Sequence, residues 1–276
     1  MGVHKLLKEL DGVLYADYLT EILMASGKHP DSETKKFEVR MNQSKLKHNT
    51  ILEDLEKVSS MDAKNPVKMY VQARKIPPEY HYKLFYCPNF KAWVNKTLPG
   101  KFEDELRDEP RLIIPFFGAD GELFGFQGRS FSKKSSLRYI TIMLDERPKI
   151  YGLDKHDPHL ATTYVVEGPI DSMFLPNCLA AAGGNIVQNL QTTKTEKERF
   201  VVVYDNEPRN PHTIHKMEKA IDQGYRICVW PAGLIGKDIN DLILKGYTQK
   251  QVVDLIKENT YSGLSATLAL TEWKKV

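Results

Sequence analysis

The chain is poor in cysteine, has no long hydrophobic run and carries little excess charge. Its 276 residues include only three cysteines, Cys87, Cys178 and Cys228, none at a spacing typical of a metal site or a disulfide. The sequence therefore predicts no zinc site, and we expect the thiols to be packed as small hydrophobic side chains. Charges occur within the first ten residues and no apolar run approaches the length of a membrane span. We expect a cytoplasmic protein with no membrane partner.

The net charge of +3 is too small to indicate nucleic-acid binding by itself. A local basic groove can nevertheless occur on a nearly neutral chain, so the positions of the cations matter more than their sum. Hydrophobic residues make up 41% and charged residues 27%, which is ordinary for a globular protein. The length is sufficient for two compact domains.

The first half of the chain predicts an N-terminal segment followed by a mixed α+β subdomain. Residues 1–53 contain a helical pattern over 4–26 and a basic stretch over 28–50, interpreted as a solvated tether rather than a phosphate-binding arm. Residues 54–157 begin with a short helix at Asn65-Pro66 and an aromatic patch over 80–93, which we assign to the core although it could stack bases. Two apolar runs over 111–117 and 122–129, joined by an Asp-Gly turn, predict a β-hairpin, and a further strand is expected over 138–142.

The second half alternates buried strands with amphipathic helices. Strands are predicted over residues 164–166, 179–182, 201–204 and 225–230, and helices over 170–175, 212–223, 239–244 and 249–258. This alternation is typical of a parallel sheet covered on both faces, which we assign to residues 158–262. Residues 263–276 predict a final helix. The expected fold class is therefore α/β, a mixed α+β subdomain followed by a parallel α/β sheet.

Acidic residues follow three of these predicted strands. Glu167 follows the first, Asp205 and Glu207 follow another, and Asp238 follows the last. Because the carboxyl ends of parallel strands meet at one edge of a sheet, we expect these side chains to meet there. Oxygen ligands without histidine or cysteine favour Mg²⁺ or Mn²⁺, and two such ions can drive an in-line displacement at phosphorus. Two of these positions also have interpretations without a metal. The residues from Asp205 onward are rich in turn formers and could be a bare loop, and Asp238 could simply cap the helix that follows it.

Three phrases in this region resemble a known family. They are Glu167-Gly168-Pro169-Ile170-Asp171-Ser172, Asp205-Asn206-Glu207-Pro208-Arg209 and Lys237-Asp238-Ile239-Asn240-Asp241-Leu242. They resemble the Toprim domain, and in particular the DnaG-type DNA primases of T-even bacteriophages. The resemblance implies that Glu167, Asp205, Glu207 and Asp238 bind the metal and that the first three are catalytic; whether Glu167 is a ligand or handles a proton stays open. Asp171 and Asn240 are expected to orient these neighbours.

The same resemblance implies cations that contact the template and the incoming nucleotide. By position these are Arg129, Arg138 and Lys149, with Lys237 beside the acidic residues. Arginine suits this role because its guanidinium group binds phosphate in a bidentate manner. Each of these residues taken alone is also typical of an ordinary surface charge. Lys133 and Lys134 are weaker candidates.

The resemblance as a whole implies a primase catalytic core. Such an enzyme makes short RNA primers on single-stranded DNA from NTPs and works beside a replicative hexameric helicase in the primosome of a phage-infected cell. The alternatives are a Toprim nuclease, against which the basic subdomain argues, and a remnant that binds DNA or helicase without initiating. A topoisomerase is less favoured because no tyrosine lies in a recognisable strand-cleavage domain. Family members begin with a cysteine-rich zinc module that this sequence cannot build, so template-specific initiation is not expected from this chain alone.

Overall fold

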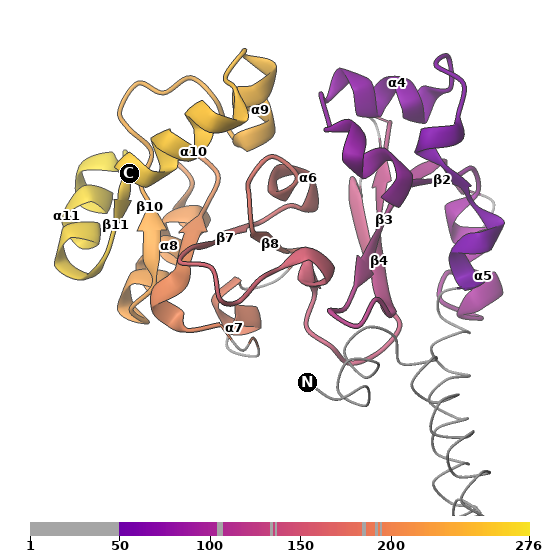
Figure 1. Cartoon of the computed structure of the whole chain (residues 1–276), viewed down its shortest axis with the longest axis horizontal. Coiled ribbons are helices and arrows are strands. Elements are labelled where there is room, and N and C mark those ends of the chain that lie inside the picture. Colours follow the sequence, from indigo (N-terminus) through magenta and orange to yellow (C-terminus); the bar gives the residue numbers. More distant parts are fainter. Residues whose placement is uncertain are drawn as a thin grey trace, which may run out of the picture. The chain divides into compact units, whose positions relative to one another are not determined.

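The structure is a computed structural model that describes residues 50–276 except 104–106, 133–134, 136, 184–185, 191–192 and 194 (Figure 1). The helix predicted over 4–26, nearly all of the basic stretch over 28–50, and Lys133 and Lys134 lie outside the described residues. The described residues form two β-sheets, one of five strands and one of six. The five-stranded sheet lies within residues 54–157, whereas the six-stranded sheet takes one strand, Ile150–Tyr151, from that region and its other strands from residues 158–262.

The first sheet is entirely antiparallel, in the order β1-β2-β3-β4-β5. Its strands are β1 (Glu56–Lys57), β2 (Phe85–Cys87), β3 (Arg111–Phe117), β4 (Leu123–Ser130) and β5 (Tyr139–Met143). The predicted hairpin is confirmed as β3 and β4, and Gly121 adopts a φ of +75° in its turn. That backbone conformation favours glycine because a Cβ atom would clash with the chain.

Short helices surround this sheet. They are η1 (Thr50–Asp54), η2 (Val58–Ser60), α4 (Pro66–Ala73), η3 (Pro78–Lys83) and α5 (Phe90–Thr97). Helix α4 begins where expected because the Asn65 side chain accepts the backbone N–H of Val67 and Pro66 occupies the first turn. Most of the aromatic patch is core, as predicted: Phe90 and Trp93 pack with Phe126 of β4.

The second sheet has the order β11-β10-β9-β7-β8-β6. Its strands are β6 (Ile150–Tyr151), β7 (Thr163–Val166), β8 (Cys178–Ala181), β9 (Phe200–Val203), β10 (Arg226–Cys228) and β11 (Thr260–Tyr261). The four central strands are parallel, as predicted, whereas the edge strands β6 and β11 are antiparallel to their neighbours. The parallel core brings the carboxyl ends of β7 and β9 side by side.

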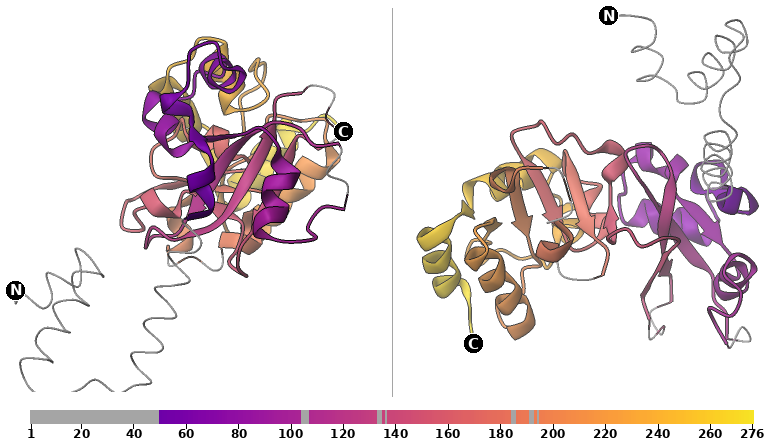
Figure 2. Two further views of the ribbon diagram at one scale, coloured as in Figure 1. Left: turned by 90° about the vertical axis from the view of Figure 1, so that its right-hand side faces the viewer. Right: turned by 90° about the horizontal axis from the view of Figure 1, so that it is seen from below.

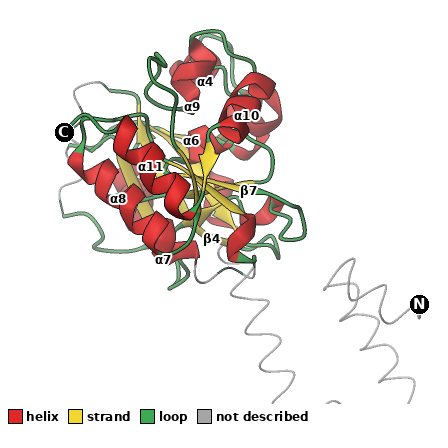
Figure 3. Ribbon diagram, turned by 90° about the vertical axis from the view of Figure 1, so that its left-hand side faces the viewer, coloured by secondary structure: helices red, strands yellow, loops and turns green. Residues whose placement is uncertain are grey.

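Helices cover both faces of the second sheet (Figure 3). The helical elements are η4 (Leu153–Lys155), α6 (Pro169–Ser172), α7 (Ile186–Leu190), η5 (Lys197–Arg199), α8 (Pro211–Asp222), α9 (Ile239–Leu244), α10 (Gln249–Glu258) and α11 (Gly263–Trp273). Along β9, Val202 packs with the cluster of α7, α8 and α11, while Val201 and Val203 pack with the cluster of α6, α9 and α10. Because both faces are buried, the strand is apolar at every position.

The two sheets lie side by side (Figure 1, Figure 2), and strand β3 contacts β6 and η4. Phe116 of β3 and Tyr151 of β6 contact edge to face, with ring centroids 5.8 Å apart. One buried cluster therefore spans both sheets. In the part of the chain that the structure describes, no helix is both long and apolar enough to cross a membrane.

Candidate active site

Four carboxylates line one small recess at the carboxyl end of the second sheet. Glu167 follows β7, Asp171 lies on α6, Asp205 is two residues beyond β9, and Asp238 precedes α9. The recess exists because β7 and β9 are neighbouring parallel strands whose ends meet at one edge. The structure therefore brings together three of the acidic residues expected to meet, and it adds Asp171 to them.

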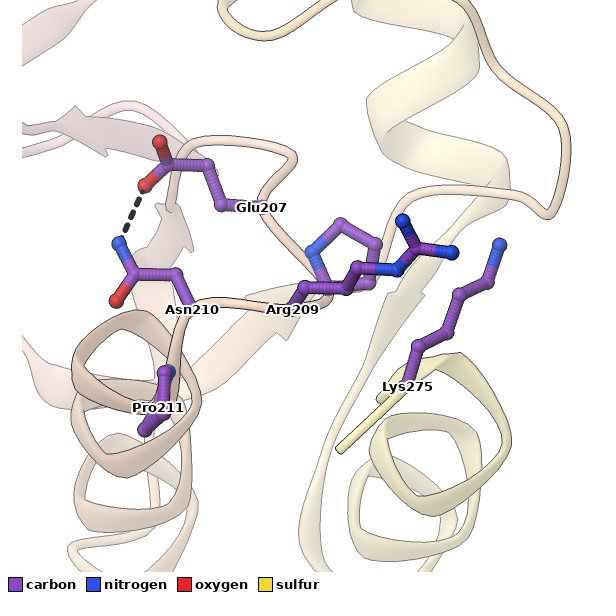
Figure 4. A pocket seen from close by; sticks show the side chains of 6 residues that line it. Glu207, Arg209, Asn210, Pro211 and Lys275 are labelled. Atoms are coloured by element: carbon purple, nitrogen blue, oxygen red, sulfur yellow. Dashed lines mark hydrogen bonds between the residues drawn. The ribbon is translucent and has the colours of Figure 1, made fainter.

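Glu207 lies at the side of the recess and faces a lysine. The Nζ atom of Lys237 lies 2.9 Å from Oε1 of Glu207 and 3.7 Å from Oδ2 of Asp205, so these two acidic residues share one cation. Burial opposes ionisation of Glu207, but hydrogen bonds from Lys237, Asn210 and Thr213 lower the pKa of its carboxyl group. Figure 4 shows the bond from Asn210. A second lysine, Lys216 of α8, lies 2.8 Å from Oε1 of Glu167.

Two carboxyl groups of the recess have raised pKa values. Burial and repulsion from Asp238 and Asp205 raise the pKa of Asp171 to about 8, although the backbone N–H of Asn240 donates to Asp171 and opposes the shift. Burial and repulsion from Glu167 and Asp238 raise the pKa of Asp205 to about 7. Both carboxyl groups therefore hold their protons more tightly than an exposed aspartate does, first because they are buried and second because other carboxylates are close.

The oxygen donors of the recess suit a hard divalent cation rather than zinc. Burial is the main cause of the raised pKa values of Asp171 and Asp205, and a bound cation would relieve the repulsion between carboxylates that adds to it. The ammonium group of Lys237 already lies beside Glu207 and Asp205. Among the described residues, however, no three histidine, cysteine or acidic side chains converge closely enough to hold a metal ion as they stand. Metal binding at this site therefore requires the acidic side chains to move toward one another.

Beside the recess lies a groove of about 780 Å³ lined by cations. The cations are Arg74, Arg129, Arg138 and Lys237. Asp238 lines both the groove and the recess, so the two cavities adjoin. Of the cations expected from the sequence, Lys149 is exposed and does not line this groove.

Arg129 at the end of β4 is the most buried cation of the groove, with 7% of its surface exposed. Its Nε atom donates to the hydroxyl of Tyr70, and its guanidinium group lies 4.2 Å from the ring centroid of Tyr139. Within the described part of the chain, its Nη1 atom has no hydrogen-bond partner. A buried donor of this kind favours an anionic ligand, because leaving it unpaired is costly.

Arg74 and Asn240 connect the groove to the recess. Nη1 of Arg74 donates to Oδ1 of Asn240 at 2.8 Å, and Nδ2 of Asn240 donates to the carbonyl of Arg74 at 2.7 Å. Asn240 is buried, and its backbone N–H donates to Oδ1 of Asp171 at 2.8 Å. Arg74 could not be found from the sequence, because no local pattern links the end of α4 to residue 240.

The fold is that of primase catalytic cores. The structure is similar to the Aquifex aeolicus primase zinc-binding and RNA polymerase domains, with a TM-score of 0.60 and 20% identity, covering 94% of this chain and 70% of that one. It is also similar to a DnaG primase catalytic domain bound to single-stranded DNA, with a TM-score of 0.59 and 16% identity over 83% of each chain. These likenesses confirm the predicted α/β fold class.

The sequence relationship is closer than the structural likenesses. The DNA primase of Enterobacteria phage T4 is 36% identical over 273 residues, which are 98% of this chain and 78% of the T4 protein. No protein-family model matches the chain. The chain belongs to the DNA primase family of enzymes, and the resemblance to T-even phage primases is confirmed.

Proposed function

We propose that this chain is a primase catalytic core that synthesises short RNA primers on single-stranded DNA by metal-dependent nucleotidyl transfer from NTPs. The observation that carries the proposal is that a recess of four carboxylates opens beside a groove lined by four cations. Nucleotidyl transfer needs both features side by side, because the metal acts at the phosphorus atom and the phosphates and template must be held next to it.

In this proposal the acidic residues form a Toprim-type site for Mg²⁺ or Mn²⁺. Glu167, Asp205, Glu207 and Asp238 hold the metal, which supplies activation of the attacking hydroxyl and neutralisation of the leaving pyrophosphate. Asp171 supports them from within the recess and is held by the backbone N–H of Asn240. We place Glu167 among the ligands because it lines the recess beside Asp205.

The groove cations hold phosphates in this proposal. Arg129 offers a fixed guanidinium group with a free donor, Arg74 is fixed by Asn240, and Arg138 and Lys237 are exposed enough to follow a flexible ligand. They orient the triphosphate and the template strand so that the reacting groups meet at the recess. We keep Lys149 as a template contact outside this groove.

The biological setting proposed is replication in the cytoplasm of a phage-infected cell, beside a replicative hexameric helicase. It is supported by the relationship to the T4 enzyme.

Primer synthesis tests the proposed function. The protein is incubated with Mg²⁺, labelled ribonucleotides and single-stranded DNA, with and without a supplied dinucleotide and a helicase. Glu167→Gln and Asp205→Asn should each lower incorporation about 1,000-fold, because bound metal supplies several kcal/mol of transition-state stabilisation. Circular dichroism checks that the variants fold, and Glu198→Gln, at an exposed position on η5, serves as the matched control.

The alternatives predict other outcomes. Metal-dependent degradation of DNA without incorporation would indicate a nuclease. Folded, metal-binding protein that makes no product under any condition would indicate a binding remnant. Full activity in both acidic-site variants would show that the active site lies elsewhere.

A further inference from the structure

The loop after β9 carries a residue whose hydrogen-bonding groups are almost all in use. Asn206 lies between Asp205 and Glu207, and its Nδ2 atom donates to the carbonyls of Leu234 at 3.2 Å and Gly236 at 2.9 Å. Its Oδ1 atom accepts the indole N–H of Trp273 at 3.3 Å. Carbonyls only accept and an indole only donates, so these partners define the orientation of the amide. The side chain of Asn206 thereby joins its own loop to the loop of Leu234 and Gly236 and to helix α11.

The loop that Asn206 contacts is the one that leads to Asp238. The backbone N–H of Asn206 donates to the carbonyl of Lys237 at 2.6 Å, directly before Asp238. The segments carrying Asp205, Glu207 and Asp238 are therefore joined by three hydrogen bonds from one residue. The distance between these acidic groups depends on the contacts of Asn206, because each carboxylate stands on a short loop rather than within a strand.

Helix α11 supports this loop from outside the recess. Trp273, in its last turn, is buried and donates to Asn206, and the backbone N–H of Lys275 donates to the carbonyl of Pro208 at 2.8 Å. Asn206 and Pro208 flank Glu207, so both sides of this acidic residue are held by the same short segment. Figure 4 shows Lys275 beside the turn that contains Arg209.

The contacts of α11 are made on the face of the sheet away from α9 and α10. Ala266, Leu270 and Trp273 pack with the cluster that contains α8, and Nζ of Lys274 lies 3.4 Å from Oε1 of Glu218. This helix is therefore anchored to the second sheet by buried side chains on one side and bonded to the loop at its end. Neither Asn206 nor Trp273 is among the residues lining the acidic recess.

We infer that Asn206 and Trp273 are positioning residues, which keep the Asp205–Glu207 loop next to the loop that carries Asp238, so that only the acidic side chains have to move when a divalent cation binds. The inference rests on the proposed metal-dependent function. Its physical basis is that Asp205 and Asp238 line one recess from two different loops, and the hydrogen bonds of Asn206 join these loops directly. In the metal-free protein, the hydrogen bonds of Asn206 keep these two loops together.

Two substitutions remove these contacts to different degrees. Trp273→Phe keeps an aromatic ring in the buried position and removes the indole N–H. Asn206→Ala removes all three side-chain bonds without adding a charge near the metal. Leu268→Ala is the matched control, because Leu268 is exposed on the same helix.

The first measurement uses metal-free protein. Backbone amide hydrogen exchange is followed over residues 204–210 and 234–238. Trp273→Phe should speed exchange there about fivefold, which corresponds to one ordinary hydrogen bond, and Asn206→Ala should speed it more. Leu268→Ala should leave it unchanged.

The second measurement is direct Mn²⁺ binding, with free Mn²⁺ measured by electron paramagnetic resonance. Affinity should fall about fivefold in Trp273→Phe and further in Asn206→Ala. In primer synthesis, the metal concentration for half-maximal rate should rise by a similar factor, while excess Mn²⁺ restores kcat. A purely structural role would lower the amount of folded enzyme and leave the metal requirement unchanged.

The outcomes separate the two proposals. The positioning role alone would be overturned by the following result. Wild-type protein binds Mn²⁺, and folded Trp273→Phe binds Mn²⁺ equally well and exchanges its backbone amide hydrogens equally slowly. Should Asn206→Ala fail to fold, Trp273→Phe decides the question, because it keeps the ring. Wild-type protein that binds no Mn²⁺ would overturn the proposed metal site and the positioning role with it.

Discussion

Asp171 is the acidic residue most strongly affected by its surroundings. Its pKa is raised from 3.8 to about 8 by burial and by the neighbouring carboxylates. In the unfolded chain this group ionises near its ordinary value, so between about pH 4 and pH 8 the folded protein binds more protons at this position than the unfolded chain does. Its contribution to stability is therefore favourable at low pH and is lost as the pH rises through that window.

We expect Asp171→Asn to stabilise the metal-free protein much more at pH 9 than at pH 5. The amide has the shape of the carboxyl group and its oxygen can still accept the backbone N–H of Asn240, but it cannot ionise. The free energy of unfolding at pH 9 should rise by about 3–6 kcal/mol, because each unit by which the folded pKa exceeds the unfolded one corresponds to about 1.4 kcal/mol. Urea denaturation in the presence of a chelator measures it.

The control for this prediction is Asp222→Asn, because Asp222 is exposed on α8. If Asp171→Asn raised the free energy of unfolding as much at pH 5 as at pH 9, ionisation of Asp171 would not be the cause. Addition of Mn²⁺ at pH 9 should stabilise the wild-type protein more than Asp171→Asn, since bound metal relieves the same repulsion.

At the scale of elements, strand β4 and helix α5 approach each other through a glycine. A Cβ atom on Gly128 would lie 2.5 Å from Cε2 and 2.8 Å from Cζ of Phe90, whose ring is fully buried. The backbone of β4 can therefore pack directly on the aromatic ring. The same strand continues into Arg129, so this packing determines where the buried cation of the groove lies.

Gly128→Ala should lower the free energy of unfolding by about 1–3 kcal/mol, because the ring or the strand must move to admit the methyl group. Urea denaturation at neutral pH measures the loss. In a Phe90→Leu background the additional loss should be clearly smaller, since the clashing atoms are gone. Strictly additive losses would argue against this contact as the cause.

At the scale of the whole described molecule, the groove takes its cations from both halves of the chain. Arg74, Arg129 and Arg138 come from the part with the first sheet, and Lys237 comes from the loop before α9. The Arg74–Asn240 pair holds these parts together beside the acidic recess. A phosphate chain in the groove would therefore contact both halves at once.

Arg138→Ala should reduce the salt dependence of single-stranded DNA binding. Each lost phosphate contact lowers the slope of log Kobs against log salt by about 0.7 for a single strand. Titrations by fluorescence anisotropy at several salt concentrations measure the slope, with the exposed Lys219 on α8 changed to alanine as the control. An unchanged slope in Arg138→Ala would remove this residue from the groove contacts.

The sequence alone predicted much of this molecule. Helices α9 and α10, the hairpin β3–β4 and the parallel core of the second sheet were all predicted, because they depend on local patterns of apolar residues, turns and caps. The meeting of Glu167 and Asp205 could also be predicted, since the carboxyl ends of parallel strands lie at one edge of a sheet. Asp238 was predicted to join them as well, and it reaches the recess from the residue directly before α9. Residue chemistry and motif resemblance were sufficient to identify the primase family.

Only the tertiary structure revealed the contacts between distant segments. Arg74 and Asn240 are 166 residues apart, and Asn206 and Trp273 are 67 apart. The tertiary structure also decided three further features. They are the edge positions of β6 and β11, the place of Asp171 in the recess, and the position of Lys149 outside the residues that line the groove. Side-chain hydrogen bonds over such separations leave no periodic pattern, because each depends on how whole elements pack rather than on their neighbours in the chain.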